Sequence, residues 1–121
     1  MDFTENTLIA YPVTVNDEGM YNHVKRVGER LLGNTNVGLS NLVMGAEDFS
    51  FYTQRVPSAF FSIGVRNESI GAVHLLHSPN FFIDEEALPI GAALHTAVAM
   101  SYLDHTSLEM QILEEKRISC K

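Results

Sequence analysis

The stretch that decides the predicted fold is VHLLHSPNFFID, residues Val73 to Asp84 of a chain of 121 residues. An apolar run carries His74 and His77 and then meets Ser-Pro-Asn, which favours a turn. Asp84 follows and suits the N-cap of a helix. A strand, a turn and a helix in this order are typical of an α/β layer, and open α/β sheets bind ligands at their strand ends. His77 is therefore the leading candidate for a functional residue.

Capping residues and apolar spacing predict three helices around this stretch. The first runs from about Asp17 to Leu32, with Asn16 or Asp17 as its cap and Gly33 as its stop. A short second helix is expected over Phe49 to Gln54, and a long third helix over Asp84 to about Leu103. The first helix is amphipathic and the third is rich in small residues, and both patterns favour packing against a sheet.

The remaining segments predict strands and loops. Ala59 to Val65 has the aromatic and β-branched content of a buried strand, and Arg66 to Ser69 is interpreted as an exposed loop. Val37 to Val43 supports no more than a short irregular strand or a loop, and Met1 to Ala10 suggests a short strand. Residues 105–121 are expected to form a frayed helix or to be disordered. The predicted fold class is α/β, in a single unit whose sheet is incomplete.

Composition excludes several classes of function. The chain is 45% hydrophobic and 19% charged, and no apolar run approaches the roughly 18 residues of a membrane span. The net charge is −7, and up to Ser101 eleven acidic residues face five basic ones without a basic stripe, so nucleic acid is not an expected partner. Cys120 is the only cysteine, so an internal disulfide is impossible and the redox compartment cannot be inferred.

Two groups of side chains can carry chemistry. His74 and His77 form an H-x-x-H pair, which binds one metal ion only if a turn brings both rings together. The alternatives are that only one of the two histidines is a ligand, or that His77 is a polar residue that caps the turn. Glu47 and Asp48 can do acid–base work where they converge, but at a helix start they more simply stabilise the helix dipole. Three further histidines lack ligand spacing and are interpreted as structural or exposed: His23, His95 and His105.

Four motifs resemble the C-terminal part of the M20 peptidase family. They are YPVTVND at Tyr11–Asp17, MGAEDF at Met44–Phe49, FFSIGVRN at Phe60–Asn67, and LHSPNF through LPIGAA at Leu76–Ala93. The subgroup that the chain looks like is the plant IAA-amino acid hydrolases, which release auxin from its amide conjugates with amino acids. Because the motifs keep one order and cover about Asp2 to Asp104, the resemblance is specific.

The resemblance implies a domain organisation. Residues 1–10 would be the end of an inserted dimerisation, or lid, domain, and residues 11–104 the C-terminal part of the catalytic domain, in which helices flank a sheet. Residues 105–121 form a tail outside the match. Family members form homodimers and act on auxin–amino acid conjugates, so such a conjugate is the expected substrate. Full-length relatives are expected in the endoplasmic reticulum lumen, but RISCK at the end of this chain is not a retention signal.

The resemblance also implies site residues. His77 matches the last metal-ligand histidine of a two-metal site, and Gly45 and Glu47 belong to a loop near it. In the family a divalent metal, manganese or zinc, polarises the amide carbonyl and activates water, and a glutamate is the general base. The other ligands and the general base have no counterpart here, so no catalytic residue is assigned. The chain alone is expected to be inactive and not to retain metal tightly. The alternative is a non-enzymatic interaction module that pairs with a full-length relative.

Overall fold

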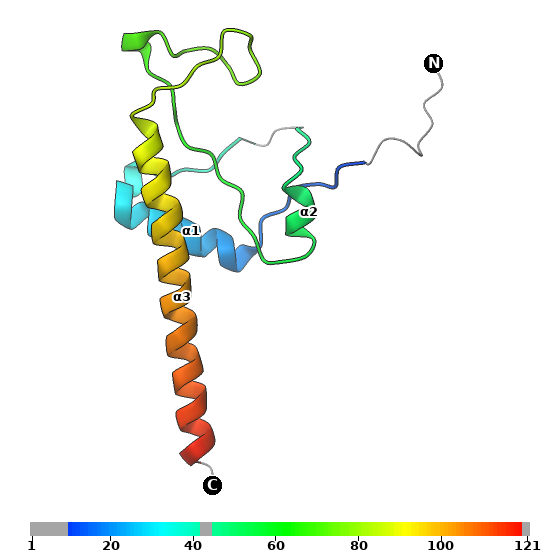
Figure 1. Cartoon of the computed structure of the whole chain (residues 1–121), viewed down its shortest axis with the longest axis vertical. Coiled ribbons are helices and arrows are strands. Elements are labelled where there is room, and N and C mark those ends of the chain that lie inside the picture. Colours follow the sequence, from blue (N-terminus) through cyan, green and yellow to red (C-terminus); the bar gives the residue numbers. More distant parts are fainter. Residues whose placement is uncertain (1–9, 42–44, 120–121) are drawn as a thin grey trace.

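The computed structural model describes residues 10–41 and 45–119 (Figure 1). In chain order the elements are α1 (Glu18–Leu32), the 3-10 helix η1 (Asn34–Asn36), α2 (Ser50–Thr53), the 3-10 helix η2 (Glu68–Ile70) and α3 (Ala87–Ser119). The long helix α3 is the axis of the structure. Helix α1 packs across it, and irregular chain links the other elements beside its N-terminal half (Figure 1).

Helix α1 begins and ends where its local signals predict. The backbone N–H of Met20 donates to Asp17 Oδ1 at 2.9 Å, so Asp17 rather than Asn16 is the N-cap. Gly33 has a φ of 86°, which a residue without a side chain adopts freely, and it ends the helix. Asn16 instead bonds to the backbone of Phe60: its Oδ1 accepts from the N–H at 2.7 Å, and its Nδ2 donates to the carbonyl at 3.0 Å. Asp17 thus caps α1, and the adjacent Asn16 connects the start of the helix to the backbone at Phe60.

Replacing Asp17 by alanine should lower the free energy of unfolding by about 0.5–2 kcal/mol. Alanine leaves the N–H of Met20 without its side-chain acceptor and removes a negative charge from the positive end of the helix. Chemical unfolding followed by circular dichroism measures the change. The matched control is Asp17→Asn, which keeps an acceptor and should lose less. An equal loss in both variants would show that capping is not what the carboxylate contributes.

The core lies where α1 and α3 cross. Val27 and Gly28 of α1 are buried, and Leu94 of α3 is 6% exposed. A methyl group on Gly28 would lie 3.4 Å from Val37 Cγ2 and 4.0 Å from Leu94 Cδ1, which are ordinary packing distances, so Gly28 lies directly beside both side chains. On the same helix pair the ring of His23 bonds through Nε2 to the carbonyl of Val98 at 3.0 Å. Of the two interpretations of His23, structural or exposed, this contact favours the structural one.

Helix α3 starts just after the residue predicted to cap it. The carbonyl of Asp84 accepts from the N–H of Ala87 at 3.1 Å, and Asp84 Oδ1 accepts from the N–H of Glu86 at 3.1 Å. The N–H of Asp84 donates to the carbonyl of Val65 at 3.1 Å. Asp84 therefore closes the turn that precedes α3 and joins it to the end of the extended chain.

The predicted end of α3 near Leu103 is wrong, because the helix continues to Ser119. Of the two alternatives for the tail, the backbone of residues 105–119 is helical, and residues 120–121 lie outside the described ranges. The sequence beyond Leu103 contains no glycine or proline, so nothing local stops the helix. Figure 1 shows this half of α3 extending away from the other elements.

The predicted sheet is not confirmed. Residues 59–65 are extended, and half-buried odd positions alternate with exposed even positions, as in a strand. Within the described ranges, however, the one β-bridge is an isolated antiparallel pair, Asn67 with Ala72. Beside the extended segment, the N–H of Asp17 bonds to the carbonyl of Ser58 at 2.9 Å without forming a ladder. A strand needs a neighbour to complete its hydrogen bonds, and the described chain does not provide one.

The other segments predicted as strands, and the short second helix, have different outcomes in the structure. Residues 37–41 are irregular, in agreement with the loop alternative, and residues 42–43 lie outside the described ranges. The strand suggested for residues 1–10 also falls almost entirely outside them. The strand expected before His77 is not formed: residues 73–75 have no regular secondary structure, and residues 76–77 form a turn. The short second helix is confirmed as α2, although it covers only Ser50–Thr53.

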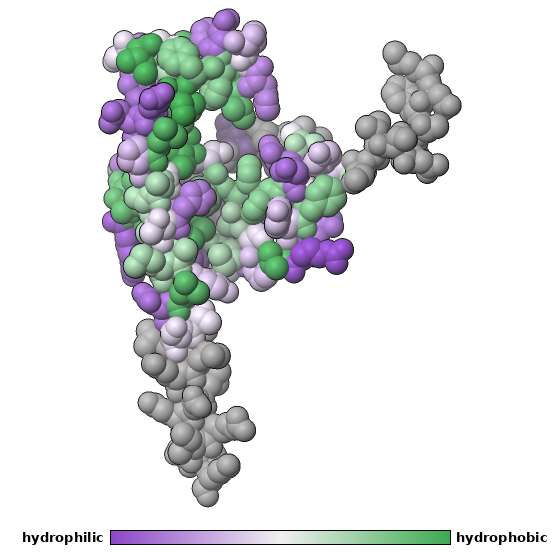
Figure 2. Space-filling view, in the orientation of Figure 1, coloured by the Kyte–Doolittle hydropathy of each residue, from purple (hydrophilic) through white to green (hydrophobic). Residues whose placement is uncertain are grey.

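Large apolar side chains stay exposed on the described surface. Figure 2 shows them along the N-terminal half of α3 and on the loops beside it, and Leu88 and Ile90 of α3 are 56% and 42% exposed. Exposed apolar faces of this extent suit helices that cover a further layer of structure. In the described ranges, no helix has the length and apolar character that crossing a membrane would require.

Candidate metal-ligand site at His77

His77 lies at the third position of a tight turn. The N–H of Ser78 donates to the carbonyl of Leu75 at 3.1 Å, and His77 has a φ of 69°. A type II turn requires a positive φ at this position. A second turn follows directly, because the N–H of Phe81 donates to the carbonyl of Ser78 at 3.0 Å and the N–H of Asn80 donates to Ser78 Oγ at 3.2 Å. Ser-Pro-Asn therefore forms a turn as predicted, and the turns reverse the chain at His77.

The two turns place the imidazole of His77 on the surface. His74 and His77 are both exposed, and Leu75 and Leu76 between them are 82% and 65% exposed. The hydrogen bonds and ion pairs among the described residues do not include the ring of His77. The alternative interpretation, in which the ring nitrogens cap the turn, is therefore not what the structure shows. The imidazole is accessible to a ligand.

Glycine at position 77 should give a more stable chain than alanine by roughly 0.5–1 kcal/mol. Histidine tolerates a φ of 69° better than most residues, but its Cβ still causes steric strain at this φ. Alanine keeps the Cβ and the strain, whereas glycine removes both. Equilibrium unfolding of His77→Gly and His77→Ala compares them, since both lack the imidazole. Greater stability of the alanine variant would contradict the left-handed conformation of this residue.

The Gly45–Glu47 loop is placed at the start of α2. The carbonyl of Glu47 accepts from the N–H of Ser50 at 3.1 Å, and the carbonyl of Asp48 accepts from the N–H of Phe51 at 3.1 Å. Both carboxylates thus precede a helix, as predicted, and Gly45 is exposed. Figure 1 shows α2 apart from the loop that follows η2 and carries His77. The structure does not bring these residues and His77 into one cluster.

The described residues near His77 could supply one ligand to a metal ion, which is His77 itself. Among the described residues, no group of three or more His, Cys, Asp and Glu side chains is arranged to hold a metal ion. A catalytic zinc site typically has three protein ligands and an open position. His77 supplies one accessible nitrogen, so the described chain does not complete a metal site.

A groove of about 790 Å³ lies elsewhere in the structure. It is bounded by α1, residues 36–40, the extended residues 59–64, and α3 at Ile90 and Leu94, and His77 does not line it. Lys25 is the one charged residue in the lining. The groove therefore lies between the helices and irregular chain, and most of its lining residues are apolar.

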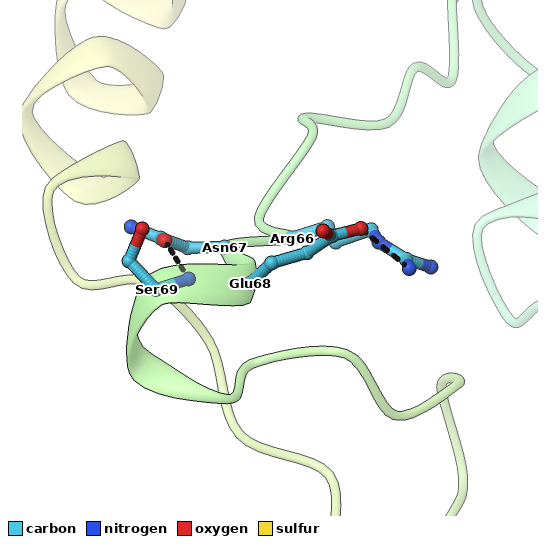
Figure 3. A network of polar contacts seen from close by, with 4 residues as sticks. All are labelled: Arg66, Asn67, Glu68 and Ser69. Atoms are coloured by element: carbon cyan, nitrogen blue, oxygen red, sulfur yellow. Dashed lines mark hydrogen bonds and ion pairs between the residues drawn. The ribbon is translucent and has the colours of Figure 1, made fainter.

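Residues 66–69 contain polar contacts that were not predicted from the sequence. The segment interpreted as an exposed loop, residues 66–69, contains an ion pair between Arg66 and Glu68 at 3.0 Å (Figure 3). In the same turn, Asn67 Oδ1 accepts from the N–H of Ser69 at 2.9 Å (Figure 3). The order Asn-Glu-Ser was a readable signal, because asparagine commonly bonds to the backbone two residues later.

Comparison with known proteins identifies the family of this chain. The family model described as Peptidase family M20/M25/M40 matches residues 3–101, and the chain therefore belongs to that family. It is 50% identical over 104 residues to IAA-amino acid hydrolase ILR1-like 6 of Arabidopsis thaliana. The matched region is 86% of this chain and 22% of that relative. It is 40% identical over 103 residues to IAA-amino acid hydrolase ILR1-like 4 of the same plant, covering 85% and 23% of the two proteins.

A relative of lower identity is a carboxypeptidase. The chain is 36% identical over 92 residues to thermostable carboxypeptidase 2 of Saccharolobus solfataricus, which covers 76% of this chain and 23% of that protein. The chain thus spans less than a quarter of the length of each of these relatives. The predicted resemblance to M20 hydrolases, and to the IAA-amino acid hydrolases among them, is confirmed, and enzymes of this family generally use divalent metal ions.

Proposed function

We propose that this chain is part of an M20 amidohydrolase that cleaves the amide bond of auxin–amino acid conjugates, and that it contributes His77 as a metal ligand. The observation that carries the substrate class is the 50% identity to an IAA-amino acid hydrolase over 104 residues. The ligand role is supported by the exposed imidazole on a backbone defined by two turns. A rigid backbone lowers the cost of orienting a ligand.

The proposal includes the finer assignments made by resemblance. Residues 11–104 belong to the catalytic domain, residues 1–10 end an inserted dimerisation domain, and Gly45 and Glu47 lie near the complete site. The metal is manganese or zinc. Because the described residues offer a single ligand, the chain by itself should not hydrolyse conjugates. Turnover by the purified chain with manganese, at the rate of a complete relative, would overturn this part.

A chimera tests the proposed function. In IAA-amino acid hydrolase ILR1-like 6, the region that this chain matches is replaced by this chain, and release of indole-3-acetic acid from its amino acid conjugates is measured with manganese present. The expected result is hydrolysis within about tenfold of the relative, since half of the matched residues are identical and cores tolerate hydrophobic substitutions that keep volume and pattern. A folded chimera without hydrolysis would contradict the proposal. Faster cleavage of a dipeptide than of a conjugate would instead favour a carboxypeptidase.

A further inference from the structure

The extended residues 59–65 lie with one face against α3. The ring centroids of Phe61 and His95 are 4.9 Å apart. A methyl group on Gly91 of α3 would lie only 2.9 Å from Ile63 Cδ1, so the side chain of Ile63 lies directly on the helix at this glycine. The half-buried odd positions of the segment therefore pack on α3, whereas the even positions are exposed.

One edge of this segment is already bonded to the start of α1. In an extended chain, successive residues direct their backbone N–H and C=O groups to opposite edges. Asn16 bonds to both backbone groups of Phe60, and the carbonyl of Ser58 accepts from the N–H of Asp17 at 2.9 Å. The even-numbered residues thus direct their groups toward this part of the chain, and the odd-numbered residues direct theirs to the opposite edge.

The opposite edge is unpaired over three residues. Within the described ranges, the backbone N–H and C=O groups of Ala59, Phe61 and Ile63 make no hydrogen bond. Next along this edge, the carbonyl of Val65 accepts from the N–H of Asp84 at 3.1 Å. The three unpaired residues line the groove of about 790 Å³, so open space borders them. An unpaired edge is a template for pairing with another strand.

The free edge is complementary to a second copy of itself in one register. In this register Phe61 lies opposite the second copy's Phe61, and Ala59 and Ile63 pair with each other. Pro57 then lies opposite Val65. Because proline has no N–H to donate, it faces the one carbonyl that is already bonded within its own chain. A shift by two residues would place Pro57 opposite Ile63 or Val65 opposite Ala59, and would leave a carbonyl or an N–H without a partner.

Charge does not oppose this pairing. Residues 56–65 contain no charged side chain, although the chain has a net charge of −7, so no like charges face each other across the pair. We propose that this chain forms a two-fold symmetric dimer in which residues 59–63 of two copies pair as antiparallel strands. Each copy offers the same edge, so the interface closes on itself. The proposal concerns this chain by itself and does not rest on the proposed function.

Sedimentation velocity of this chain tests the dimer, with a reductant present so that Cys120 cannot form a disulfide. The expected species has twice the 13.5 kDa mass of one chain. Ala59→Pro removes an N–H that bonds twice in the symmetric pair, and should raise the dimer dissociation constant by roughly tenfold or more. Ser62→Pro is the matched control, because the N–H of Ser62 points to the other edge, and should change the constant by less than about threefold. A monomer at every concentration, or equal effects of the two prolines, would overturn the proposal.

Cross-linking tests the register. In the proposed pair Phe60 lies opposite the second copy's Ser62, on the exposed face, where Cα atoms of such a pair are about 4.5 Å apart. This spacing suits a disulfide, whereas two copies of either residue would be diagonal neighbours about 7–8 Å apart. In a Cys120→Ser background, a mixture of Phe60→Cys and Ser62→Cys chains should form disulfide dimers on mild oxidation, and neither variant alone should.

Circular dichroism of each variant checks that the helices are retained. Disulfide dimers from Phe60→Cys alone, or from Ser62→Cys alone, would indicate a register shifted by two residues and would overturn the proposal. The absence of cross-links from the mixture, with helices retained, would show that two copies do not pair through this edge.

Discussion

Replacing Leu94 by alanine should lower the free energy of unfolding by about 2–5 kcal/mol and abolish the cooperative transition of the chain. Buried apolar residues in the described ranges are few, namely Val27, Ala72, Ala87 and Leu94. Leu94 has the largest side chain of this group and lies at the crossing of α1 and α3, against Gly28. Alanine would leave a cavity at the centre of the contact that holds the two helices together.

Urea unfolding followed by circular dichroism measures this effect. The matched control is Leu94→Met, which keeps the volume and should lose less than about 1.5 kcal/mol. A steep transition in the alanine variant, within about 0.5 kcal/mol of the unsubstituted chain, would contradict the placement of the core at this crossing.

Replacing His77 by glutamine in the chimera should lower conjugate hydrolysis by more than about 100-fold, because the loss of a direct ligand exceeds the 10–100-fold effect typical of groups behind the ligands. Glutamine is similar in size and polar, so the fold should be retained. The measurement is kcat/KM for a conjugate at fixed manganese concentration.

His74→Gln is the matched control for this experiment. His74 is also exposed and lies on the same loop, three positions earlier in the sequence. It should retain activity within about tenfold of the unsubstituted chimera, since a surface substitution away from ligands has little effect. Equal losses in both variants would indicate that the loop, rather than the imidazole of His77, is needed.

Local signals in the sequence were enough to predict α1. An aspartate at the start, apolar residues at helical spacing and a glycine at the end act within one or two turns, and Asp17 and Gly33 occupy the predicted positions. The turn at Ser-Pro-Asn was predictable for the same reason. The beginning of α3 was also close to the prediction, because Asp84 bonds to the N–H groups that follow it.

Features that depend on residues far apart in the sequence could not be predicted from local signals. The aromatic and β-branched residues of 59–65 favour a strand, but a ladder requires a second strand, and the described ranges do not contain one beside this segment. The end of α3 was missed because Leu103 is followed by neither a breaker nor a cap, so apolar periodicity weakens while the helix continues.

The candidate site was predicted in part. Spacing alone allowed His77 to be a metal ligand or a polar residue that caps the turn. The resemblance to M20 hydrolases favoured the ligand role. The positive φ of His77 could not be read from the sequence, since most histidines have a negative φ. The contact of Asn67 with Asp84 joins residues that are 17 positions apart, so only the folded chain shows it.

Manganese content is the measurement that tests the ligand role of His77 most directly. The chimera and its His77→Gln and His74→Gln variants are purified, equilibrated with manganese, and analysed for bound metal by atomic absorption. The account predicts that the unsubstituted chimera and His74→Gln bind manganese with similar affinity. His77→Gln should bind it more than roughly 100-fold more weakly, beyond the effect typical of groups behind the ligands. Equal manganese binding by all three proteins would show that His77 is not a metal ligand.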